Sequence, residues 1–499
     1  MKISVSPEAI SLLSRVSDWL SSQDIQAYLV GGFVRDMLLG RETKDIDIAV
    51  DADAPAVSRK AAAAFGGKYI LLDEANQIGR VVLFEDDRVK WQLDFSTLRG
   101  NIQQDLAERD FTIDAMAVEP GKISQKSEID LPDIIDPFDG RHDLEARTIR
   151  AVSDSIFTAD AARLLRAVRL AANLDFNIDA RTEALVRQSA PLIAGVAGER
   201  VREELLRILA SPGVGEHVSY LDELGLLTAL IPELEPARGV TQPFIHYWTV
   251  FEHLIHTSAA VEFLTGQGQW PDSAEEVLAP VPWSDELSRH FAQEVSGGST
   301  RRSLLKLIAL LHDIAKPQTR FLDETGRARF LGHPQQGAEI AAAILERLRF
   351  SAREIKLARI MIENHLRPTQ MSPEGMPTRR AIYRYFRDTG DAGIDILFLS
   401  LADHLATRGP KLELADWREH ARMTGYVLEQ HFAQEGPAAP PKLIDGHDIM
   451  NTFGMTPGPK VGELLEAVHE AQAAGEVNTR EEARAFIEHL ISASKANDR

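Results

Sequence analysis

The sequence contains no cysteine among its 499 residues. Disulfides, thiolate metal sites and cysteine nucleophiles are therefore excluded, and any bound metal must be held by His, Asp or Glu. The absence of cysteine is typical of a reducing compartment, so we expect a cytoplasmic protein. No stretch approaches the roughly 18 to 20 consecutive apolar residues that a membrane span requires. The N-terminal MKISVSPEAISLLSRVSDWL also lacks the apolar core and cleavage site of a signal peptide, and we expect no membrane partner.

Basic residues are scarce relative to acidic ones. The chain has 55 Lys and Arg against 75 Asp and Glu, which gives a formal net charge of −20. This charge argues against a protein that coats nucleic acid without selection, because such binding depends on Lys and Arg neutralising phosphates. Local basic stripes remain compatible with holding one RNA. The apolar and charged fractions are those of ordinary globular proteins, and the length allows about two to four domains.

Hydrophobic periodicity changes along the chain. Residues 25–118 alternate short β-like runs with helical segments. From Asp154 onward, apolar residues recur at intervals of three and four residues and predict helices almost everywhere. This predicts an α+β fold, in which a small mixed sheet with helices is followed by an all-α region. The predicted strands carry the runs QAYLV, DIDIAV, RVVLF, VKWQLDF and DAMAV.

Three segments are rich in turn-forming residues. Residues 121–139 are predicted to form an exposed loop, and residues 265–300 an insertion between two helices whose role the sequence does not reveal. QEGPAAPPK, residues 434–442, is predicted to be a linker because its prolines cannot continue a helix. A short helical tail follows it.

The stretch YLVGGFVRDMLLGRETKDIDIAV, residues 28–50, predicts a strand, a Gly-Gly turn, a helix and a second strand. Side chains alternate along a strand, so Asp45 and Asp47 project from one face while the neighbouring isoleucines enter the core. Two carboxylates on one rigid face suit Mg²⁺, which completes its coordination with water and substrate phosphates. Glycines beside a helix N-terminus let the backbone approach those phosphates. Taken alone, these residues also fit a solvated strand face and an ordinary turn.

Further motifs follow this stretch in order. They are DLAERDFTIDAMA at 105–117, FDGRHDLEARTIR at 138–150, ADAARLLRAVRLAANLDF at 159–176 and ERVREELLRIL at 199–209. Together with LVGGFVRDMLLG and DIDI, they resemble the class II tRNA nucleotidyltransferase and poly(A) polymerase family. The resemblance implies a polymerase-β-like catalytic head over residues 1–150 and a helical neck over residues 151–240.

The resemblance also implies roles for single residues. Asp45 and Asp47 match the two metal-binding catalytic carboxylates, and Asp94, on a predicted strand, is a candidate third carboxylate. The remaining matches fall in the family's nucleotide-binding motifs. They are Gly31, Gly32, Arg35 and Asp36 on the phosphate side, Arg109 and Asp110 in the ribose region, Asp139 in the flexible D-G-x-x-D-L element, and Asp160, Arg163, Arg166 and Arg169 in the neck.

Asp160 and Arg163 match the family's base-reading Asp and Arg. Spaced by three, they are expected to share one helix face and to present an acceptor beside a donor fork, which matches the edge of adenine or cytosine. A solvated basic face accounts for Arg169 better than for Arg163.

The chain departs from the family motifs at three positions, with Glu108 in place of Arg, Asp114 in place of Asn and Ala159 in place of Glu. None of these changes removes an implied metal ligand. Each leaves open which base is selected and in what order.

A second constellation, of histidines and aspartates, lies between residues 245 and 405. A lone helical His is more often a packed or surface residue than a ligand, but here a helical His, an adjacent His-Asp pair, two further His and a late Asp follow in order. The set resembles the HD phosphohydrolase superfamily and implies an HD domain over residues 241–433. The implied metal ligands are His253, His312, Asp313 and Asp403, with His333 and His365 as candidates for a second metal.

The metal of this HD site is left open, because mixed imidazole and carboxylate ligands suit Mn²⁺, Fe²⁺, Co²⁺, Ni²⁺ or Zn²⁺, with Mg²⁺ also compatible. A bound metal would activate water for phosphoester hydrolysis, and Lys316 is expected to face the substrate phosphate. His246 and His256 share roughly one helix face with His253 and are alternatives to it as the first ligand. His404 is expected to pack rather than to bind.

The expected function is template-independent addition of the 3′-terminal CCA to tRNA from CTP and ATP, with Mg²⁺ at the head. Residues 434–499 resemble the C-terminal region of HD-bearing bacterial tRNA nucleotidyltransferases and are expected to hold RNA. Alternatives are a specialist that adds only A or only CC, and a poly(A) polymerase, which usually has a strongly basic tail. From other classes, an HD phosphohydrolase with an RNA- or nucleotide-binding head and a non-catalytic RNA-binding protein are alternatives. The oligomeric state is open.

Overall fold

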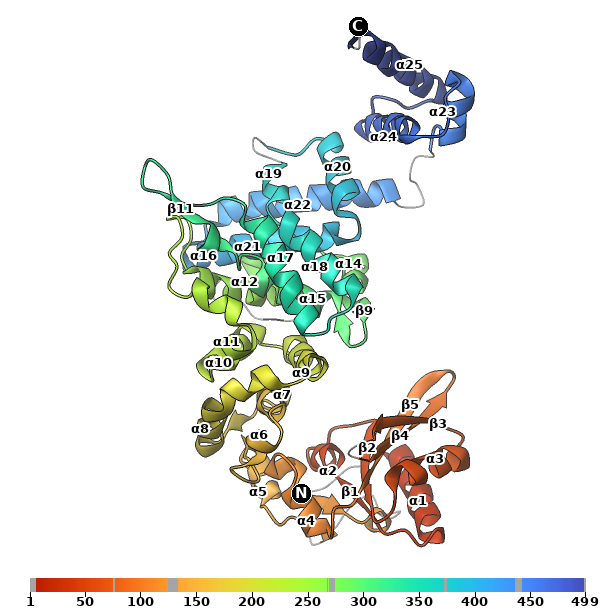
Figure 1. The fold of residues 1–499 in the computed structure, drawn as a ribbon, viewed down its shortest axis with the longest axis vertical. Helices are drawn as coiled ribbons and strands as arrows, with labels where there is room; N and C mark the ends of the chain where they lie inside the picture. The colour runs from red at the N-terminus through yellow and green to blue at the C-terminus, as the bar shows by residue number, and fades with distance from the viewer. Residues whose placement is uncertain are drawn as a thin grey trace. The chain divides into compact units, whose positions relative to one another are not determined.

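The computed structural model describes residues 6–74, 77–123, 133–266, 268, 274–371, 375–435 and 442–497. The chain forms two compact units (Figure 1). The N-terminal unit comprises residues 1–196 and 223–230, and the C-terminal unit comprises residues 197–222 and 231–499. The predicted order, a small sheet with helices and then a helical region, is confirmed.

A six-stranded sheet forms the first part of the N-terminal unit. Its strand order is β3-β4-β5-β2-β1-β6, and only the pair β2–β5 is parallel. The strands are β1 (Ala27–Val30), β2 (Asp45–Val50), β3 (Lys68–Asp73), β4 (Ile78–Glu85), β5 (Arg88–Thr97) and β6 (Ala117–Val118). All five predicted strands are present. Strand β3 was missed because KYILLD has no apolar alternation, and at the sheet edge most of its residues are exposed.

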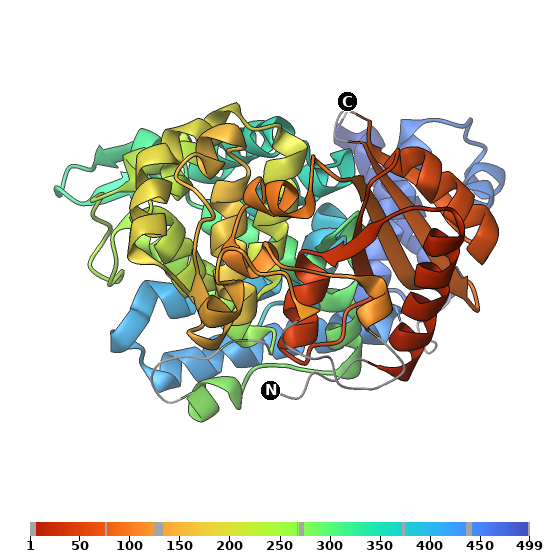
Figure 2. The ribbon, with the colours of Figure 1, turned by 90° about the horizontal axis from the view of Figure 1, so that it is seen from below.

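Three helices accompany this sheet: α1 (Pro7–Ser22), α2 (Gly32–Leu38) and α3 (Ala54–Phe65). Figure 2 shows α1 and α3 alongside the strands. Ser6 and Asp53 begin α1 and α3 by accepting hydrogen bonds from backbone amides, as N-cap residues do. Helix α2 follows β1 directly, so the N-terminus of α2 lies at the end of the strand that precedes it.

The rest of the N-terminal unit is mainly helical. Its elements are α4 (Ile102–Ala107), α5 (Gly140–Glu145), β7 (Thr148–Ile149), α6 (Ile156–Ala159), α7 (Arg163–Leu174), β8 (Asn177–Ile178), α8 (Ala180–Ser189) and α11 (Leu226–Leu230). Helix α7 is amphipathic. Leu164, Leu165 and Val168 are buried, and Arg163 and Arg166 of the same helix contact the segment at residues 108–110.

Most of the described C-terminal unit is helical. Its elements are α9 (Gly198–Ala210), α10 (Val214–Glu223), α12 (Val250–Leu264), α13 (Ala274–Leu278), α14 (Asp285–Ala292), β9 (Glu294–Ser296), β10 (Ser299–Thr300), α15 (Arg301–Leu311), α16 (Lys316–Thr319), β11 (Arg320–Leu322), β12 (Ala328–Phe330), α17 (His333–Arg347), α18 (Ala352–Asn364), α19 (Arg367–Gln370), α20 (Arg379–Thr389), α21 (Gly393–Arg408) and α22 (Leu414–Glu435). Helices α12, α15 and α21 pack against one another, and α17 packs against α18. Between α12 and α15, a buried ion pair joins Lys306 to Glu262 at 2.7 Å.

The described part of the predicted insertion contains α13, α14 and the β9–β10 pair. Helix α13 is held to α22, where the buried Trp417 indole donates a hydrogen bond of 2.7 Å to the Val277 carbonyl. Of the predicted loop at 121–139, residues 124–132 lie outside the described residues, and a short helical turn occupies Pro120–Lys122. Most of the predicted linker at 434–442 also lies outside them.

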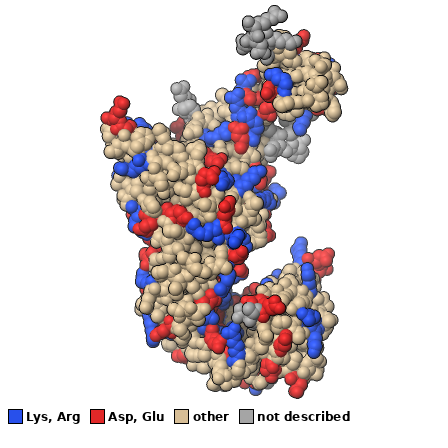
Figure 3. All heavy atoms as spheres, viewed as in Figure 1, with Lys and Arg blue, Asp and Glu red and all other residues tan. Residues whose placement is uncertain are grey.

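The predicted helical tail consists of α23 (Gly446–Phe453), α24 (Pro459–Ala474) and α25 (Arg480–Asn497). It has a hydrophobic core of its own, centred on Ile449, Val468 and Ile487. Ion pairs connect α24 to α20, with Glu470 lying 2.5 Å from Arg384 and 3.2 Å from Arg380. Figure 3 shows acidic and basic side chains interspersed over the displayed face, without one broad basic surface.

Candidate active site and metal centre

Strand β2 carries the two aspartates at the middle of the sheet. Ile46 and Ile48 are fully buried, Asp45 is exposed and Asp47 is partly buried, so the side chains alternate as predicted. In the parallel pairing of β2 with β5, Asp47 lies opposite Asp94. The sheet therefore brings the three predicted carboxylates to neighbouring positions.

The Gly-Gly turn lies so close to Arg109 and Asp47 that a side chain there would crowd them. A Cβ at Gly31 would lie 2.8 Å from Arg109 Nη1 and 3.1 Å from Asp47 Oδ2, and the φ of Gly31 is 65°, which L side chains rarely adopt. A Cβ at Gly32 would lie 3.3 Å from Arg35 Nη2. The turn, Arg109 and Asp47 thus form one small polar centre at the N-terminus of α2.

Asp47 is the perturbed carboxyl group of this centre. Removal from water raises its pKa to about 6, although the Arg109 guanidinium opposes the shift, and the neighbouring Asp94 adds to it. A cation would offset this penalty by favouring the ionised form. The fold therefore compensates the charge of Asp47 only in part.

Asp94 is already held by an arginine. Arg80 on β4 faces it across the sheet and donates from Nε and Nη2 to its two oxygens at 2.7 and 2.6 Å. This bidentate contact raises the pKa of Arg80. The sequence did not single out Arg80, because the register that sets it opposite Asp94 exists only once β4 and β5 have paired.

A buried ionic network lies beside the Gly-Gly turn. Arg35 of α2 donates to Asp36 from Nε at 2.9 Å and to Asp114 from Nη1 at 2.7 Å. On the other side of the network, Arg166 of α7 lies 2.6 Å from Asp110 and 3.4 Å from Asp114. Burial favours the neutral acid, but Arg35 and Arg166 lower the pKa of Asp114.

The expectation that Asp160 and Arg163 share a helix face is wrong. Asp160 ends α6 in an extended conformation, and its carboxylate accepts a hydrogen bond of 3.1 Å from the Ala162 amide. Arg163 is the first residue of α7 and donates to the Glu108 carbonyl at 2.8 Å. An Asp side chain competes for backbone amides near a helix start, which is why it caps the turn instead of continuing the helix.

Of the remaining predicted nucleotide-binding residues, Arg109, Asp110 and Arg169 lie in or beside this network, whereas Asp139 does not. Arg109 contacts Asp105 at 3.4 Å, and the Asp110 carboxylate accepts from the Phe111 amide at 2.9 Å. Arg169 on α7 contributes to lowering the pKa of Asp114. Asp139 is exposed at the start of α5, in the left-handed region with a φ of 60°, and no described contact joins it to the carboxylates of β2.

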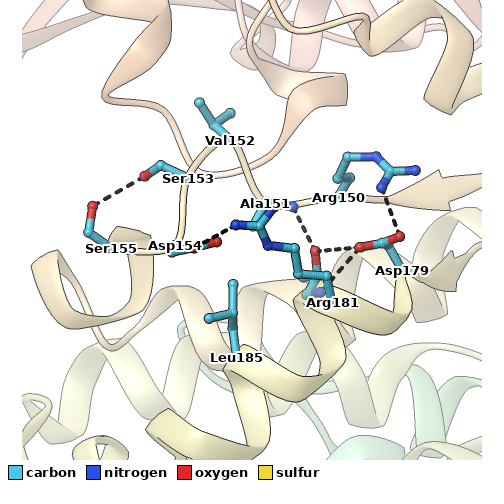
Figure 4. A pocket seen from close by; sticks show the side chains of 10 residues that line it. Arg150, Ala151, Val152, Ser153, Asp154, Ser155, Asp179, Arg181 and Leu185 are labelled. Carbon is cyan, nitrogen blue, oxygen red and sulfur yellow. Dashed lines mark hydrogen bonds and ion pairs between the residues drawn. The ribbon is translucent and has the colours of Figure 1, made fainter.

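A pocket of about 450 Å³ lies next to the segment that follows Arg150. Figure 4 shows Arg181 pointing to Asp154 and Arg150 to Asp179, with ion-pair distances of 2.6 and 2.8 Å. The polar side chains of this pocket are thus engaged with one another, and none of the predicted site residues lines it.

The HD constellation assembles in the C-terminal unit from α12, α17 and α21 and from the residues that directly follow α15 and α18. Nε2 of His253 lies 3.1 Å from Asp403 Oδ1, and Nε2 of His312 lies 3.3 Å from Asp313 Oδ2. The other oxygen of Asp313 lies 3.1 Å from His333 Nε2 and 3.6 Å from His365 Nε2. The six predicted residues therefore form one cluster, in which Asp313 contacts all four histidines and Asp403 contacts His253 and His312.

The donor set fits a cation. Nδ1 of His312, His333 and His365 each faces a backbone carbonyl, at 2.8, 2.6 and 2.7 Å respectively. Each Nδ1 must carry the proton, so each Nε2 presents a lone pair to the centre. Two of these nitrogens, in His333 and His365, lie only 3.4 Å apart, and one cation would satisfy both together with the Asp313 carboxylate.

The electrostatics of Asp313 and His365 agree with ligand roles, whereas contacts with Asp313 and Asp403 outweigh burial and raise the pKa of His253. Burial would raise the pKa of Asp313, but His312 and Lys316 hold it well below its usual range, so this carboxylate stays ionised. Burial lowers the pKa of His365 to about 4, so this imidazole stays neutral at pH 7. An ionised carboxylate and neutral imidazoles are the forms that bind divalent metals.

One expectation about the neighbouring residues is wrong, because His246 precedes α12 rather than lying on it. The ring of His246 still lies beside that of His253, with centroids 5.8 Å apart, and His256 stacks on Trp248 with centroids 3.9 Å apart. Lys316 pairs with Asp313 and donates to Gln242 at 2.7 Å. His404 packs as expected, stacked on His420 with ring centroids 4.9 Å apart.

Four family profiles match the chain. They are the Poly A polymerase head domain at residues 27–150, the probable RNA and SrmB-binding site of polymerase A at 175–238, the HD domain at 285–408 and the putative tRNA nucleotidyltransferase domain 2 at 440–487. The A-adding tRNA nucleotidyltransferase of Deinococcus radiodurans is 36% identical over 93% of this chain and 95% of its own length. The chain belongs to the tRNA nucleotidyltransferase family.

Other members of the family align with this nucleotidyltransferase over nearly the same length. The CC-adding enzyme of Thermus thermophilus is 34% identical over 92% of this chain and 93% of its own. Among solved structures, a CCA-adding enzyme with CTP has a TM-score of 0.64 at 22% identity, covering 98% of this chain and 96% of that one. The Thermotoga maritima CCA-adding enzyme with tRNA has a TM-score of 0.61 at 21% identity and covers 99% and 98% of the two chains. These likenesses show the same fold.

In the described part of the nucleotidyltransferase, no helix combines the length and apolar character needed to cross a bilayer.

Proposed function

We propose that this nucleotidyltransferase adds nucleotides of the 3′-terminal CCA to tRNA, with CTP and ATP as substrates. In each step the RNA 3′-hydroxyl oxygen forms a bond to the α-phosphorus of the nucleotide, and pyrophosphate leaves. The convergence of Asp45, Asp47 and the Gly-Gly turn where β1 ends and β2 begins carries this proposal, because it joins metal ligands to a phosphate-binding backbone.

Asp45 and Asp47 would hold divalent metal, for which we propose Mg²⁺. The metal supplies a lowered pKa for the attacking hydroxyl and charge neutralisation at the leaving pyrophosphate. Asp94 supports this centre while its charge is shared with Arg80. Gly31 and Gly32 leave room for the triphosphate, and no covalent enzyme intermediate is required.

The nucleotide is held by positive charge arranged around the turn. Arg109, whose guanidinium lies against Gly31, is suited to the ribose and phosphate side. Arg163 and Arg166 on α7, with Asp160 before it, are proposed to face the base. In the observed arrangement Arg163 donates to the Glu108 carbonyl, so reading a base requires this contact to be exchanged or shared.

A primer-extension assay tests the proposal. Purified protein with Mg²⁺ is given tRNA transcripts ending at the discriminator base, at C and at CC, with CTP or ATP separately and together. Asp45→Ala and Asp47→Ala are expected to abolish addition. Asp175→Asn, at an exposed helix end where asparagine tolerates the left-handed backbone, serves as the control. Nucleotide addition that survives in both aspartate variants would refute the proposed metal site.

The same assay decides a second candidate, a specialist that performs one part of the addition. The observation in its favour is that an A-adding and a CC-adding enzyme align with more than nine-tenths of this chain. The altered motif residues Glu108, Asp114 and Ala159 bear on the same question. Addition of A only to the transcript ending in CC, or of C only to the shorter ones, would identify a specialist.

We infer a divalent metal at the HD site, held by His253, His312, Asp313 and Asp403, with His333 and His365 able to complete it. A metal there supplies an activated water for phosphoester hydrolysis. Metal content after purification, measured for the wild type and Asp313→Ala, tests the site. Hydrolysis of bis(p-nitrophenyl) phosphate tests the activity. Wild-type protein that retains no more metal than the variant would refute it.

We also propose that the protein works in the cytoplasm and that its tail, residues 434–499, holds RNA. The lack of cysteine supports the first proposal. The match of residues 440–487 to the putative tRNA nucleotidyltransferase domain 2 supports the second. Removal of the tail is expected to raise the KM for tRNA more than the KM for nucleotide.

A further inference from the structure

Asp114 occupies an unusual position in the N-terminal unit. Its side chain is only 2% exposed, yet it meets arginines from two different helices, Arg35 of α2 and Arg166 of α7. Helix α2 begins at the phosphate-side Gly-Gly turn, whereas α7 begins with the base-side Arg163. Asp114 therefore touches both sides of the proposed nucleotide site without belonging to either.

We propose that Asp114 is a positioning residue that sets nucleotide selection by fixing α7 against the catalytic turn. This inference rests on the proposed function, because it concerns the same site. It assigns a role to a residue that lies at one of the three departures from the family motifs and that is neither a metal ligand nor a base reader.

The contacts of the segment 108–114 support this role. Two residues at the start of α7 contact this segment. Arg163 donates to the Glu108 carbonyl at 2.8 Å, and Arg166 forms an ion pair with Asp110 at 2.6 Å. The same segment carries Arg109, whose guanidinium reaches the Gly-Gly turn. A shift of α7 on this segment would therefore move the base-side arginines relative to Asp47 and the triphosphate.

The charge of Asp114 is what allows it to serve two arginines. An ionised carboxylate is an acceptor at both oxygens, so Oδ1 takes Arg35 and Oδ2 faces Arg166. An asparagine has one acceptor and one donor group, and its NH₂ would face a guanidinium that can only donate. Asp114→Asn therefore keeps the size of the side chain while breaking one of the two connections.

Geometry predicts an effect on selection rather than a uniform loss. CTP and ATP share the triphosphate and the ribose, so a disturbance confined to the metals or phosphates changes kcat/KM for both nucleotides by the same factor. A displaced base-side helix changes the two reactions unequally, because misplacement by about 1 Å can cost up to about a hundredfold in rate. The ratio of kcat/KM for the two nucleotides separates these cases.

The experiment measures kcat/KM for C addition to a transcript ending at the discriminator base and for A addition to a transcript ending in CC. Asp114→Asn is compared with the wild type and with Asp179→Asn. Asp179 is also an aspartate that pairs with an arginine, Arg150 at 2.8 Å, but it lies at the start of α8. If the wild type strongly prefers one nucleotide, the other rate is measured as misincorporation on the same transcript.

We expect Asp114→Asn to change the ratio of the two values by at least about fivefold, and Asp179→Asn to leave it within about twofold. An equal change of both values in Asp114→Asn would overturn the inference while leaving the proposed function intact. If the wild type adds neither nucleotide, the proposed function itself fails. Should Asp114→Asn not fold, Arg166→Lys is used. It keeps the charge but loses the planar fork, and an unchanged ratio would again overturn the inference.

Discussion

Asp47→Asn removes a charge that burial disfavours, and it is expected to abolish nucleotide addition while stabilising the metal-free protein at neutral pH. Burial raises the pKa of Asp47 from 3.8 to about 6. A folded-state pKa above the unfolded one means that the folded protein binds the proton more tightly. Stability is therefore fully present below about pH 4, falls as the pH rises to 6 and stays lower above it.

The size of this effect follows from the shift. About two pKa units correspond to an upper limit of about 3 kcal/mol in the free energy of unfolding. Asp47 is only partly buried, and water reaching the carboxylate reduces the difference, so we expect about 1 to 2 kcal/mol at pH 7.5. At pH 4 the gain from Asp47→Asn should vanish, because the wild-type carboxyl group is then protonated as well.

Urea unfolding without divalent metal, at both pH values, measures the effect. Asp45→Asn is the matched control on the same strand, and because Asp45 is exposed we expect its free energy of unfolding to change little. Added Mg²⁺ should stabilise the wild type and not Asp47→Asn. A destabilised Asp47→Asn protein at pH 7.5, or a gain that is equal at both pH values, would refute the reasoning.

Two further predictions concern close packing and buried charge. Gly31→Ala should reduce nucleotide addition at least about tenfold and lower the free energy of unfolding by about 1 to 2 kcal/mol, because alanine disfavours positive φ and its Cβ would meet Arg109. Primer extension and thermal unfolding measure these effects, and unchanged activity would contradict the prediction. Lys306→Met should destabilise the C-terminal unit by about 3 to 5 kcal/mol, since it leaves Glu262 buried without its cation. Urea unfolding measures that loss, with Lys460→Met, an exposed pair on α24, as the control, and equal stability of the two variants would contradict it.

The nucleotide-binding head shows how far sequence patterns reach. Alternation along DIDIAV was sufficient to place Asp45 and Asp47 on one face and the isoleucines in the core, because the period of a strand is a local property. The Gly-Gly turn followed from backbone geometry in the same way. The pairing of Arg80 with Asp94 did not, because it depends on the register between β4 and β5, which no local pattern specifies.

The neck shows where local reasoning fails. A spacing of three predicts a shared helix face only if both residues are helical, and Asp160 instead caps the turn before α7. The prediction that His246 shares a helix face with His253 fails for the same reason, since α12 begins at Val250. The competition between a side chain and the backbone for amide hydrogens decides such boundaries, and periodicity does not record it.

By itself, the sequence determined the fold class, the order of head and helical region, and the residue types available to bind metal, because these depend on composition, periodicity and motif order. Only the tertiary structure decided which charges meet. It brought His253 and Asp403 together across 150 positions of chain, joined Asp114 to two helices, and left Asp47 with a raised pKa. Such contacts depend on packing between distant elements, and burial then sets the energy of each charge.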